Sequence, residues 1–362
     1  MHVTKKMLGN KTRKSILYLD QNFFSSVHRG SKTWVDAMAK VDEILDLQLL
    51  AIPYSRTHER EAGLAGVHRD GLVKFIQEAS RGHRFEPHWN VEKTQILKGF
   101  HAYLDRAPAA YQQEEIDALC ESAHDWDRDY LVSMIFSETT DVDRKLQLKN
   151  RSTEELLAVL PQWSKSKSSF DDDMRLEVSD HARILVENFA NKYGRLVIGD
   201  VSAFFNSPIN TSVVQGMWYV LDTKKVDPTE IGAFFRSSHF AKLPSVQLSA
   251  RLYSTFKKRM REGMFPNSQS PKTRKGVSGF LADVEHVSTY APYCSAFFTD
   301  NFMARLMNDR CVSVEKDFGC KVFSHASMTE FLAWLENLRT NMTAEHATDL
   351  GWAYPKYRVF WK

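Results

Sequence analysis

The segment KSILYLDQNFFSSV (residues 14–27) carries a short apolar run that stops at Asp20 and continues with the polar residues Gln21 and Asn22. A buried strand followed directly by a helix is typical of an α/β fold. The aspartate has two interpretations. It can cap the next helix, because Asp side chains accept hydrogen bonds from free N–H groups at helix starts. Alternatively, it places a carboxylate at the carboxyl end of a strand, where open α/β sheets gather functional groups.

The strand-like runs lie near the two ends of the chain. They are SILYLD (15–20), QLLAIPYS (48–55), SAFFTD (295–300) and CKVFS (320–324). Apolar residues at helical spacing lie between and after them, as in WVDAMAKVDEILDL (34–47) and SMTEFLAWLENLR (327–339). The second of these opens with Ser327 and Glu330 at the spacing of a capping box. Strands that alternate with helices predict an α/β fold, with a mainly parallel sheet covered by helices on both faces.

The middle of the chain has a different character. From about residue 91 to about residue 275, helical spacing dominates and few runs resemble strands. We therefore predict a discontinuous α/β core formed by residues 14–90 and 276–345, interrupted by a large helical insertion at 91–275. The C-terminal tail, residues 346–362, interleaves aromatic with basic side chains. Such a tail can stack on nucleic-acid bases or pack its aromatics onto its own domain.

Composition limits the protein classes. The chain has 362 residues, of which 43% are hydrophobic and 26% charged, as expected of a globular protein with room for about two domains. No apolar stretch approaches the ~18 residues of a membrane-spanning helix. The basic N-terminus lacks the apolar region of a signal peptide. We expect a cytoplasmic protein without membrane association, whose four scattered cysteines are buried free thiols.

Four acidic residues occupy related positions. Asp20 and Asp300 end predicted strands, Glu61 lies in the first turns of the helix after the second run, and Asp283 lies on the helix before the third. Because the carboxyl ends of parallel strands meet at one edge of a sheet, we expect these acids to converge. Two carboxylates about 4 Å apart repel by roughly 4 kcal/mol at an effective dielectric near 20, and Mg²⁺ or Mn²⁺ would relieve that repulsion. Each acid taken alone could also be a helix cap or a surface residue.

The order and spacing of these acids resemble the PIN-like nuclease family. The resemblance rests on YLDQN (18–22), YSRTHEREA (54–62) and DVEHVSTYAPYCSAFFTDN (283–301). It implies a PIN-like three-layer core and metal-dependent hydrolysis of phosphodiester bonds, with RNA as the expected substrate. Carried over residue by residue, it implies that Mg²⁺ or Mn²⁺ is held or organised by the four acids, with two supporting polar groups. These residues are Asp20, Glu61, Asp283 and Asp300, supported by Asn22 and Thr299.

The sequence departs from the family pattern at Ser295, where similar runs carry an acid. If that acid helps to hold a second metal, the substitution weakens the site, whereas it costs little if Asp283 is the helix ligand. The departure leaves open a non-catalytic PIN-like module that binds nucleic acid or protein, since a fold does not dictate a function. A phosphoesterase acting on a small substrate is a third hypothesis. His286, three residues after Asp283, is interpreted as a helix neighbour.

Basic residues gather in one segment although the net charge is only +3. Between residues 251 and 279 the only acid is Glu262. The residues predicted to contact nucleic acid are Lys257, Lys258, Arg259, Arg261, Lys272, Arg274 and Lys275. They could hold a phosphate backbone near the metals, or they could form a solvated helix face that leads into a loop. The helical insertion is also a candidate surface for a protein partner.

Overall fold

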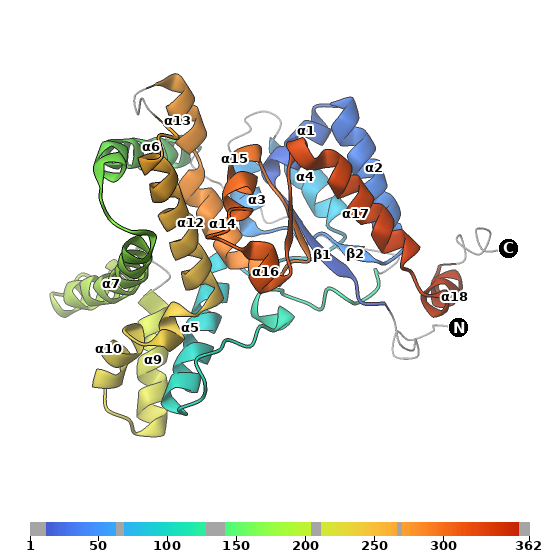
Figure 1. Ribbon diagram of the computed structural model, residues 1–362. Helices are drawn as coiled ribbons and strands as arrows, with labels where there is room; N and C mark the ends of the chain where they lie inside the picture. The colour runs from blue at the N-terminus through green and yellow to red at the C-terminus, as the bar shows by residue number, and fades with distance from the viewer. Residues whose placement is uncertain (1–11, 63–68, 128–141, 204–210, 266–269, 355–362) are drawn as a thin grey trace.

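A parallel sheet forms the centre of the protein (Figure 1). The computed structural model describes residues 12–62, 69–127, 142–203, 211–265 and 270–354. Within these ranges the strands are β1 (Ser15–Leu19), β2 (Leu50–Ala51), β3 (Ala296–Phe298) and β4 (Lys321–Phe323), in the order β2-β1-β3-β4. Every neighbouring pair is parallel. The prediction of an α/β fold with a parallel sheet is therefore confirmed. Strand β2 is much shorter than its apolar run, which includes Pro53, a residue that has no N–H to donate to a ladder.

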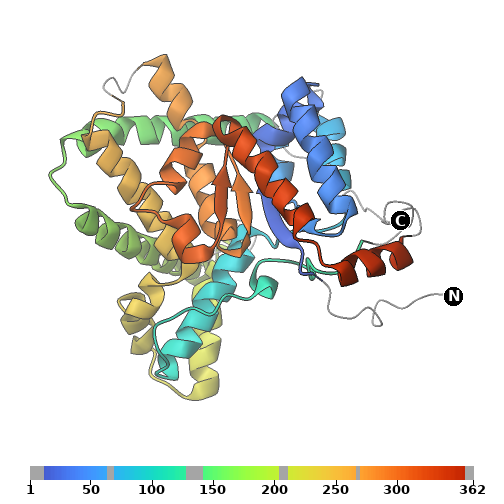
Figure 2. The same cartoon turned by 45° about the vertical axis from the view of Figure 1, so that its right-hand side comes forward.

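Helices cover both faces of this sheet (Figure 2). Those near the two ends of the chain are α1 (Gln21–His28), α2 (Lys32–Asp46), α3 (Arg56–Ala62), α4 (Arg69–Ala79), α14 (Phe280–Tyr290), α15 (Asn301–Met307), α16 (Val314–Phe318), α17 (Met328–Thr340) and α18 (Ala344–Ala353). Those of the middle are α5 (His88–Leu104), α6 (Val142–Lys165), α7 (Phe170–Val197), α9 (Thr211–Lys224), α10 (Thr229–Phe235), α11 (Ser238–Ala241), α12 (Pro244–Arg261) and α13 (Pro271–Val277). Short 3-10 turns are η3 (Glu115–Asp117), η4 (Ala291–Tyr293) and η5 (His325–Ser327).

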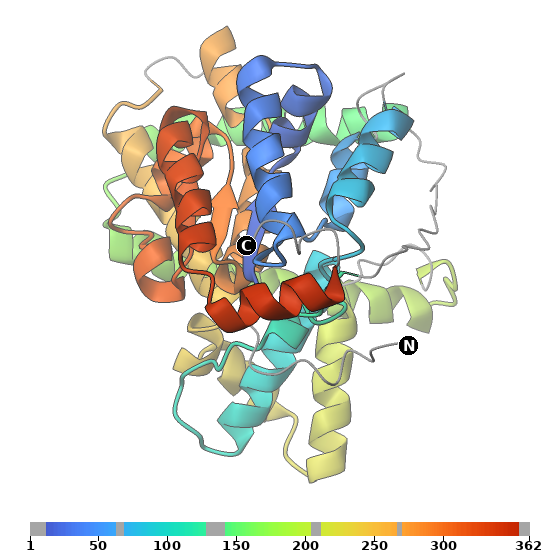
Figure 3. The same cartoon turned by 90° about the vertical axis from the view of Figure 1, so that its right-hand side faces the viewer.

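Alternation along β1 divides the core into two layers, because successive strand side chains point to opposite faces. Leu17 and Leu19 pack with α1, α2 and α17, which lie in front of the sheet in Figure 3. Tyr18 faces the other way and stacks on Phe297 of β3, with ring centroids 4.3 Å apart. That second layer is built on α14 and includes Val284. The three-layer arrangement thus follows from one buried strand with apolar residues on both faces.

The helical middle divides between two cores. Leu160 of α6 and Phe256 of α12 belong to the same hydrophobic cluster as α14 and the sheet. Phe100 of α5 and Met217 of α9 belong to a separate cluster, together with residues of α7, α10 and α11. The segment is helical as predicted, but α6 and α12 are part of a layer of the α/β core. The predicted borders of the insertion, 90/91 and 275/276, fall inside α5 and α13.

One local prediction is wrong and another is confirmed only in part. Ser327 precedes α17 without a capping hydrogen bond, because its hydroxyl accepts from the N–H of Ser324 at 2.9 Å within the turn η5. All four cysteines are free, but Cys120 and Cys311 are only partly buried.

Among the helices of the described ranges, none combines the length and apolarity needed to cross a bilayer.

The described part of the C-terminal tail packs against the protein. His346 of α18 is fully buried, and its Nε2 donates to the carbonyl oxygen of Leu47 at 2.8 Å. Tyr354 stacks on Trp126, with ring centroids 6.0 Å apart. These contacts match the interpretation in which the aromatics pack onto their own domain, except at Trp352, which is 70% exposed. Residues 355–362, which carry the rest of the predicted aromatic and basic pattern, lie outside the described residues.

Candidate metal centre

Asp20 follows β1 directly and stands at the position that caps α1. Its N–H donates to the carbonyl oxygen of Phe298 at 3.0 Å, which extends the pairing of β1 with β3 by one residue. Its backbone is extended, with φ −65° and ψ 154°, as at an ordinary helix start. The side chain nevertheless makes no capping hydrogen bond. Asp20 therefore occupies a capping position, but its carboxylate does not make the hydrogen bond that a cap would make.

Asp300 behaves in the opposite way at the end of the neighbouring strand β3. Its Oδ1 accepts from the N–H of Phe302 at 2.6 Å and from the N–H of Met303 at 3.0 Å, so it caps α15. The two hydrogen bonds fix the orientation of this carboxylate. The two residues predicted to support the acids differ in burial. Thr299 is buried, and its N–H donates to the carbonyl oxygen of Phe323, whereas Asn22 is exposed on α1. Asp300 thus serves the fold whether or not it also faces a metal.

Helix α3 is held against the end of β1 by the buried His58. The Nε2–H of His58 donates to the carbonyl oxygen of Leu19 at 2.8 Å, and its Nδ1 accepts from the N–H of Ser55 at 3.0 Å. The ring also stacks on Tyr18, with centroids 5.0 Å apart. With both nitrogens bound to the backbone, His58 is a structural residue and not a metal ligand. It brings Glu61, three residues further along α3, to the end of β1.

His58 makes a testable contribution to acid stability. Burial lowers its pKa from 6.5 to about 4. Between these values the unfolded chain binds a proton that the folded protein does not, so stability is full above pH 6.5 and falls as the pH drops through that window, by about 3 kcal/mol in total. We expect His58→Gln to flatten this fall in urea-unfolding measurements taken from neutral pH downwards. Parallel pH curves for the two proteins would contradict it.

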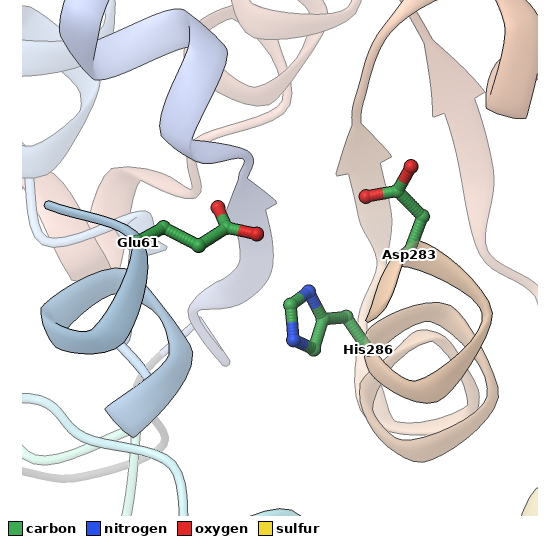
Figure 4. Close-up of side chains that lie close together, drawn as sticks. All are labelled: Glu61, Asp283 and His286. Carbon is green, nitrogen blue, oxygen red and sulfur yellow. The ribbon is translucent and has the colours of Figure 1, made fainter. Parts of the chain in front are cut away.

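Glu61, Asp283 and His286 come together across the gap between α3 and α14 (Figure 4). One ligand atom from each lies within 4.8 Å of the others. Asp283 is in the first turn of α14, and His286 follows at a spacing of three residues, which places both on one side of the helix. The His286 ring is buried, whereas the two carboxylates are partly buried. His286 is therefore more than a helix neighbour of Asp283, and the three-residue spacing is the sequence signal for a shared site.

Asp20 and Asp300 lie outside this group of three, but Glu61 and Asp300 both act electrostatically on Asp20. Burial raises the pKa of Asp20 well above its usual range, and the negative charges of Glu61 and Asp300 raise it further. The N–H groups of Gln21 and Asn22 lower it in part, although neither makes a capping hydrogen bond. The carboxylate of Asp20 is thus close enough to both neighbouring acids to be repelled by them. A cation between these groups would remove this cost.

Ser295 directly precedes β3 and so lies at the opposite end of the strands from the four acids. Its hydroxyl accepts from the N–H of Ile16 at 3.2 Å, at the start of β1, and its N–H donates to the carbonyl oxygen of the same residue at 2.7 Å. Five residues of extended chain, at about 3.3 Å each, separate Ser295 from Asp300 by roughly 16 Å. A serine here cannot weaken a site at the carboxyl ends of the strands. It instead pins the register of β3 against β1.

The basic residues of α12 pair with acids that are distant in the sequence. Lys257 contacts Glu177 of α7 at 2.5 Å, and its ammonium lies 5.0 Å from the ring centre of Trp163. Arg261 contacts the buried Asp173 of α7 at 2.7 Å. The segment that looked strongly positive along the chain is therefore neutralised in part by acids of α7, which packs against it.

The remaining predicted nucleic-acid contacts are mixed. Arg259 pairs with Glu262 and with Asp309, and Arg274 pairs with Glu154. The ammonium of Lys258 contacts the sulfur of Cys311, and Lys275 is exposed. The side chain of Lys272 lies outside the described residues. Contact with nucleic acid stays a prediction for these seven residues.

The donors at the carboxyl edge fit a hard divalent cation. Carboxylate oxygens suit Mg²⁺ and Mn²⁺, and the imidazole of His286 favours Mn²⁺ over Mg²⁺, because imidazole is a transition-metal ligand. His58, the other buried histidine nearby, is fully used by the backbone. No family model, curated protein or solved structure matches this chain, so its function is argued from these residues.

Proposed function

We propose that the protein is a metal-dependent ribonuclease with a PIN-like α/β/α core that acts on RNA in the cytoplasm. One observation carries the proposal: Asp20 holds a carboxylate that caps no helix, and the negative charges of Glu61 and Asp300 repel it. The N–H groups of Gln21 and Asn22 offset this repulsion only in part, and a neutral residue at this position would avoid it. A site that must bind a cation accounts for it.

Each residue has a role in this proposal. Glu61 and Asp283, which approach one another with His286, would hold Mg²⁺ or Mn²⁺, with Asp20 as a further ligand. A divalent cation bound there would polarise a phosphate oxygen and lower the pKa of a water molecule, which is the chemistry that phosphodiester hydrolysis requires. Asp300 would orient the site from its cap on α15, and Thr299 and Asn22 would support it.

The alternative is a PIN-like module that binds nucleic acid or protein without cleaving it. A protein partner would find exposed apolar side chains on the helical middle, such as Val197 of α7 and Tyr219 of α9. This alternative predicts binding of a metal or a partner without turnover. We favour the nuclease because the acidic cluster, and not the helical surface, is the feature that costs the fold free energy.

Cleavage of single-stranded RNA tests the proposal. We expect the purified protein to degrade RNA with Mn²⁺ or Mg²⁺ and to stop when EDTA removes the metal. Single-stranded DNA and a small phosphate monoester, tested in parallel, separate a ribonuclease from a general nuclease and from a phosphoesterase. Cleavage that persists in EDTA would reject the mechanism, and metal binding without cleavage of any substrate would favour the non-catalytic module.

A further inference from the structure

A second feature lies on the other side of α14. A cavity of about 440 Å³, open to solvent on one side, is lined by residues of α5, α7, α12 and α14, which converge beside the sheet in Figure 1. Its volume falls within the range of small-molecule sites. Glu285 and Ser288 of α14 line the cavity, whereas Asp283 and His286 belong to the candidate metal centre. One helix therefore separates the two sites, a width of about 10 Å.

The charged groups that line the cavity are arranged as two histidine–glutamate pairs. Nε2 of His88 contacts Glu285, and Nε2 of His181 contacts Glu92. Neither a lysine nor an arginine is among the described lining residues. Each carboxylate is paired with a histidine only, so the lining offers a phosphate or another anion less positive charge than a lysine or an arginine would. The cavity suits a ligand that is uncharged and rich in N–H donors.

The remaining walls offer a flat apolar surface and one unused hydroxyl. Trp89 and Tyr253 both line the cavity, and the guanidinium of Arg56 lies 5.4 Å from the centre of the Trp89 ring. Ser245 is only 4% exposed, and its Oγ has no hydrogen-bond partner. An unpaired buried hydroxyl costs about 1–3 kcal/mol. Because this Oγ is buried, a ligand recovers that cost by forming the missing hydrogen bond once the cavity wall shifts to expose it.

We propose that this cavity binds a nucleobase that carries an exocyclic amino group, from a nucleotide next to the scissile bond. Aromatic side chains stack on bases, and carboxylates accept hydrogen bonds from their amino groups. Ser245 would donate to a ring nitrogen or a carbonyl oxygen of the base. Arg56, on the same helix as Glu61, and Glu285, on the same helix as Asp283, connect the cavity to the metal centre. The inference rests on the proposed nuclease function and adds a base preference to it.

Binding of free nucleosides tests the inference separately from cleavage. Adenosine, guanosine, cytidine and uridine are titrated calorimetrically into the full-length protein in EDTA. We expect at least one nucleoside with an amino group to bind fivefold or more tightly than uridine, which has none. Glu285→Gln and Glu92→Gln should reduce this preference, because an amide presents a donor where the carboxylate only accepts.

Ser245→Ala has a matched control on the same helix. Ser254 of α12 is also fully buried with an unpaired hydroxyl, but it does not line the cavity. We expect Ser245→Ala to weaken nucleoside binding several-fold and Ser254→Ala to leave it unchanged. Absence of nucleoside binding, or an equal effect of the two variants, would overturn the inference even if RNA is cleaved. Nucleoside binding without RNA cleavage would instead reject the nuclease and retain the base site.

Discussion

Asp20→Asn is expected to reduce metal-dependent RNA cleavage by more than a hundredfold while leaving the fold at least as stable. Asparagine preserves the shape of the side chain but removes a charge that would hold the cation. Removing a group that only supports a metal ligand typically costs 10–100-fold, so the loss of a ligand should exceed that range. The measurement is the initial rate of RNA cleavage across a series of Mn²⁺ concentrations.

The same substitution should have the opposite effect on stability without metal. Because the pKa of Asp20 is raised in the folded state by burial and by Glu61 and Asp300, its ionisation destabilises the wild-type protein as the pH rises. Asp20→Asn should therefore unfold at a higher temperature than wild type in EDTA at neutral pH. This advantage should fade as the pH falls and vanish below the ordinary pKa of an aspartate, where the carboxyl is protonated in both states.

Added Mn²⁺ should reverse the order of the two proteins. A metal at a hundredfold excess over its dissociation constant stabilises wild type by about 2.7 kcal/mol, and the variant should gain much less. Asp36→Asn, at an exposed acid of α2, is the matched control and should change neither the rate nor the unfolding temperature. If Asp20→Asn cleaves RNA at the wild-type rate, Asp20 is not a ligand. If Asp20→Asn unfolds at a lower temperature than wild type in EDTA, the carboxylate of Asp20 stabilises the folded protein.

Local sequence was enough to predict the edge where the acids meet. An apolar run followed by an acid identified both Asp20 and Asp300, and the rule that parallel strands end at a common edge placed them together. The capping roles could not be predicted, because Asp20 and Asp300 share the same local pattern and only Asp300 uses its carboxylate as a cap. The backbone is nearly the same at the two residues, with φ −65° and ψ 154° at Asp20 and φ −67° and ψ 164° at Asp300, so the difference lies in the side chains.

Features formed by helices that are distant in the sequence, such as the cavity and the ion pairs of α12, could not be predicted from the sequence. The cavity behind α14 needs four helices from separate parts of the chain, and neither His181 nor Ser245 carries a local signal of its role. The charge of α12 was also misleading, since its acidic partners on α7 come about 80 residues earlier. Ion pairs between distant segments depend on packing, which spacing along one helix does not report.

Arg261→Met is expected to destabilise the protein by about 3–5 kcal/mol, because it leaves a buried carboxylate without its partner. The side chain of Arg261 is 17% exposed and that of Asp173 only 4%, and their contact at 2.7 Å joins α12 to α7. Methionine keeps the volume and flexibility of the side chain and removes only its charge and its donors. Urea unfolding gives the change in the free energy of unfolding.

The outcome decides between two roles for the basic segment. Arg183→Met on α7 removes two ion pairs, with Asp180 and Glu187, that are more than half exposed, so it should cost no more than about 1 kcal/mol. The double variant Arg261→Met with Asp173→Leu should recover most of the stability lost in the single variant, because no buried charge remains unpaired. A contact with RNA phosphate predicts the reverse: stability close to wild type in Arg261→Met, and a salt dependence of RNA affinity that is lower by about one unit of slope. Measuring both quantities on the same protein therefore shows whether Arg261 holds α7 or holds substrate.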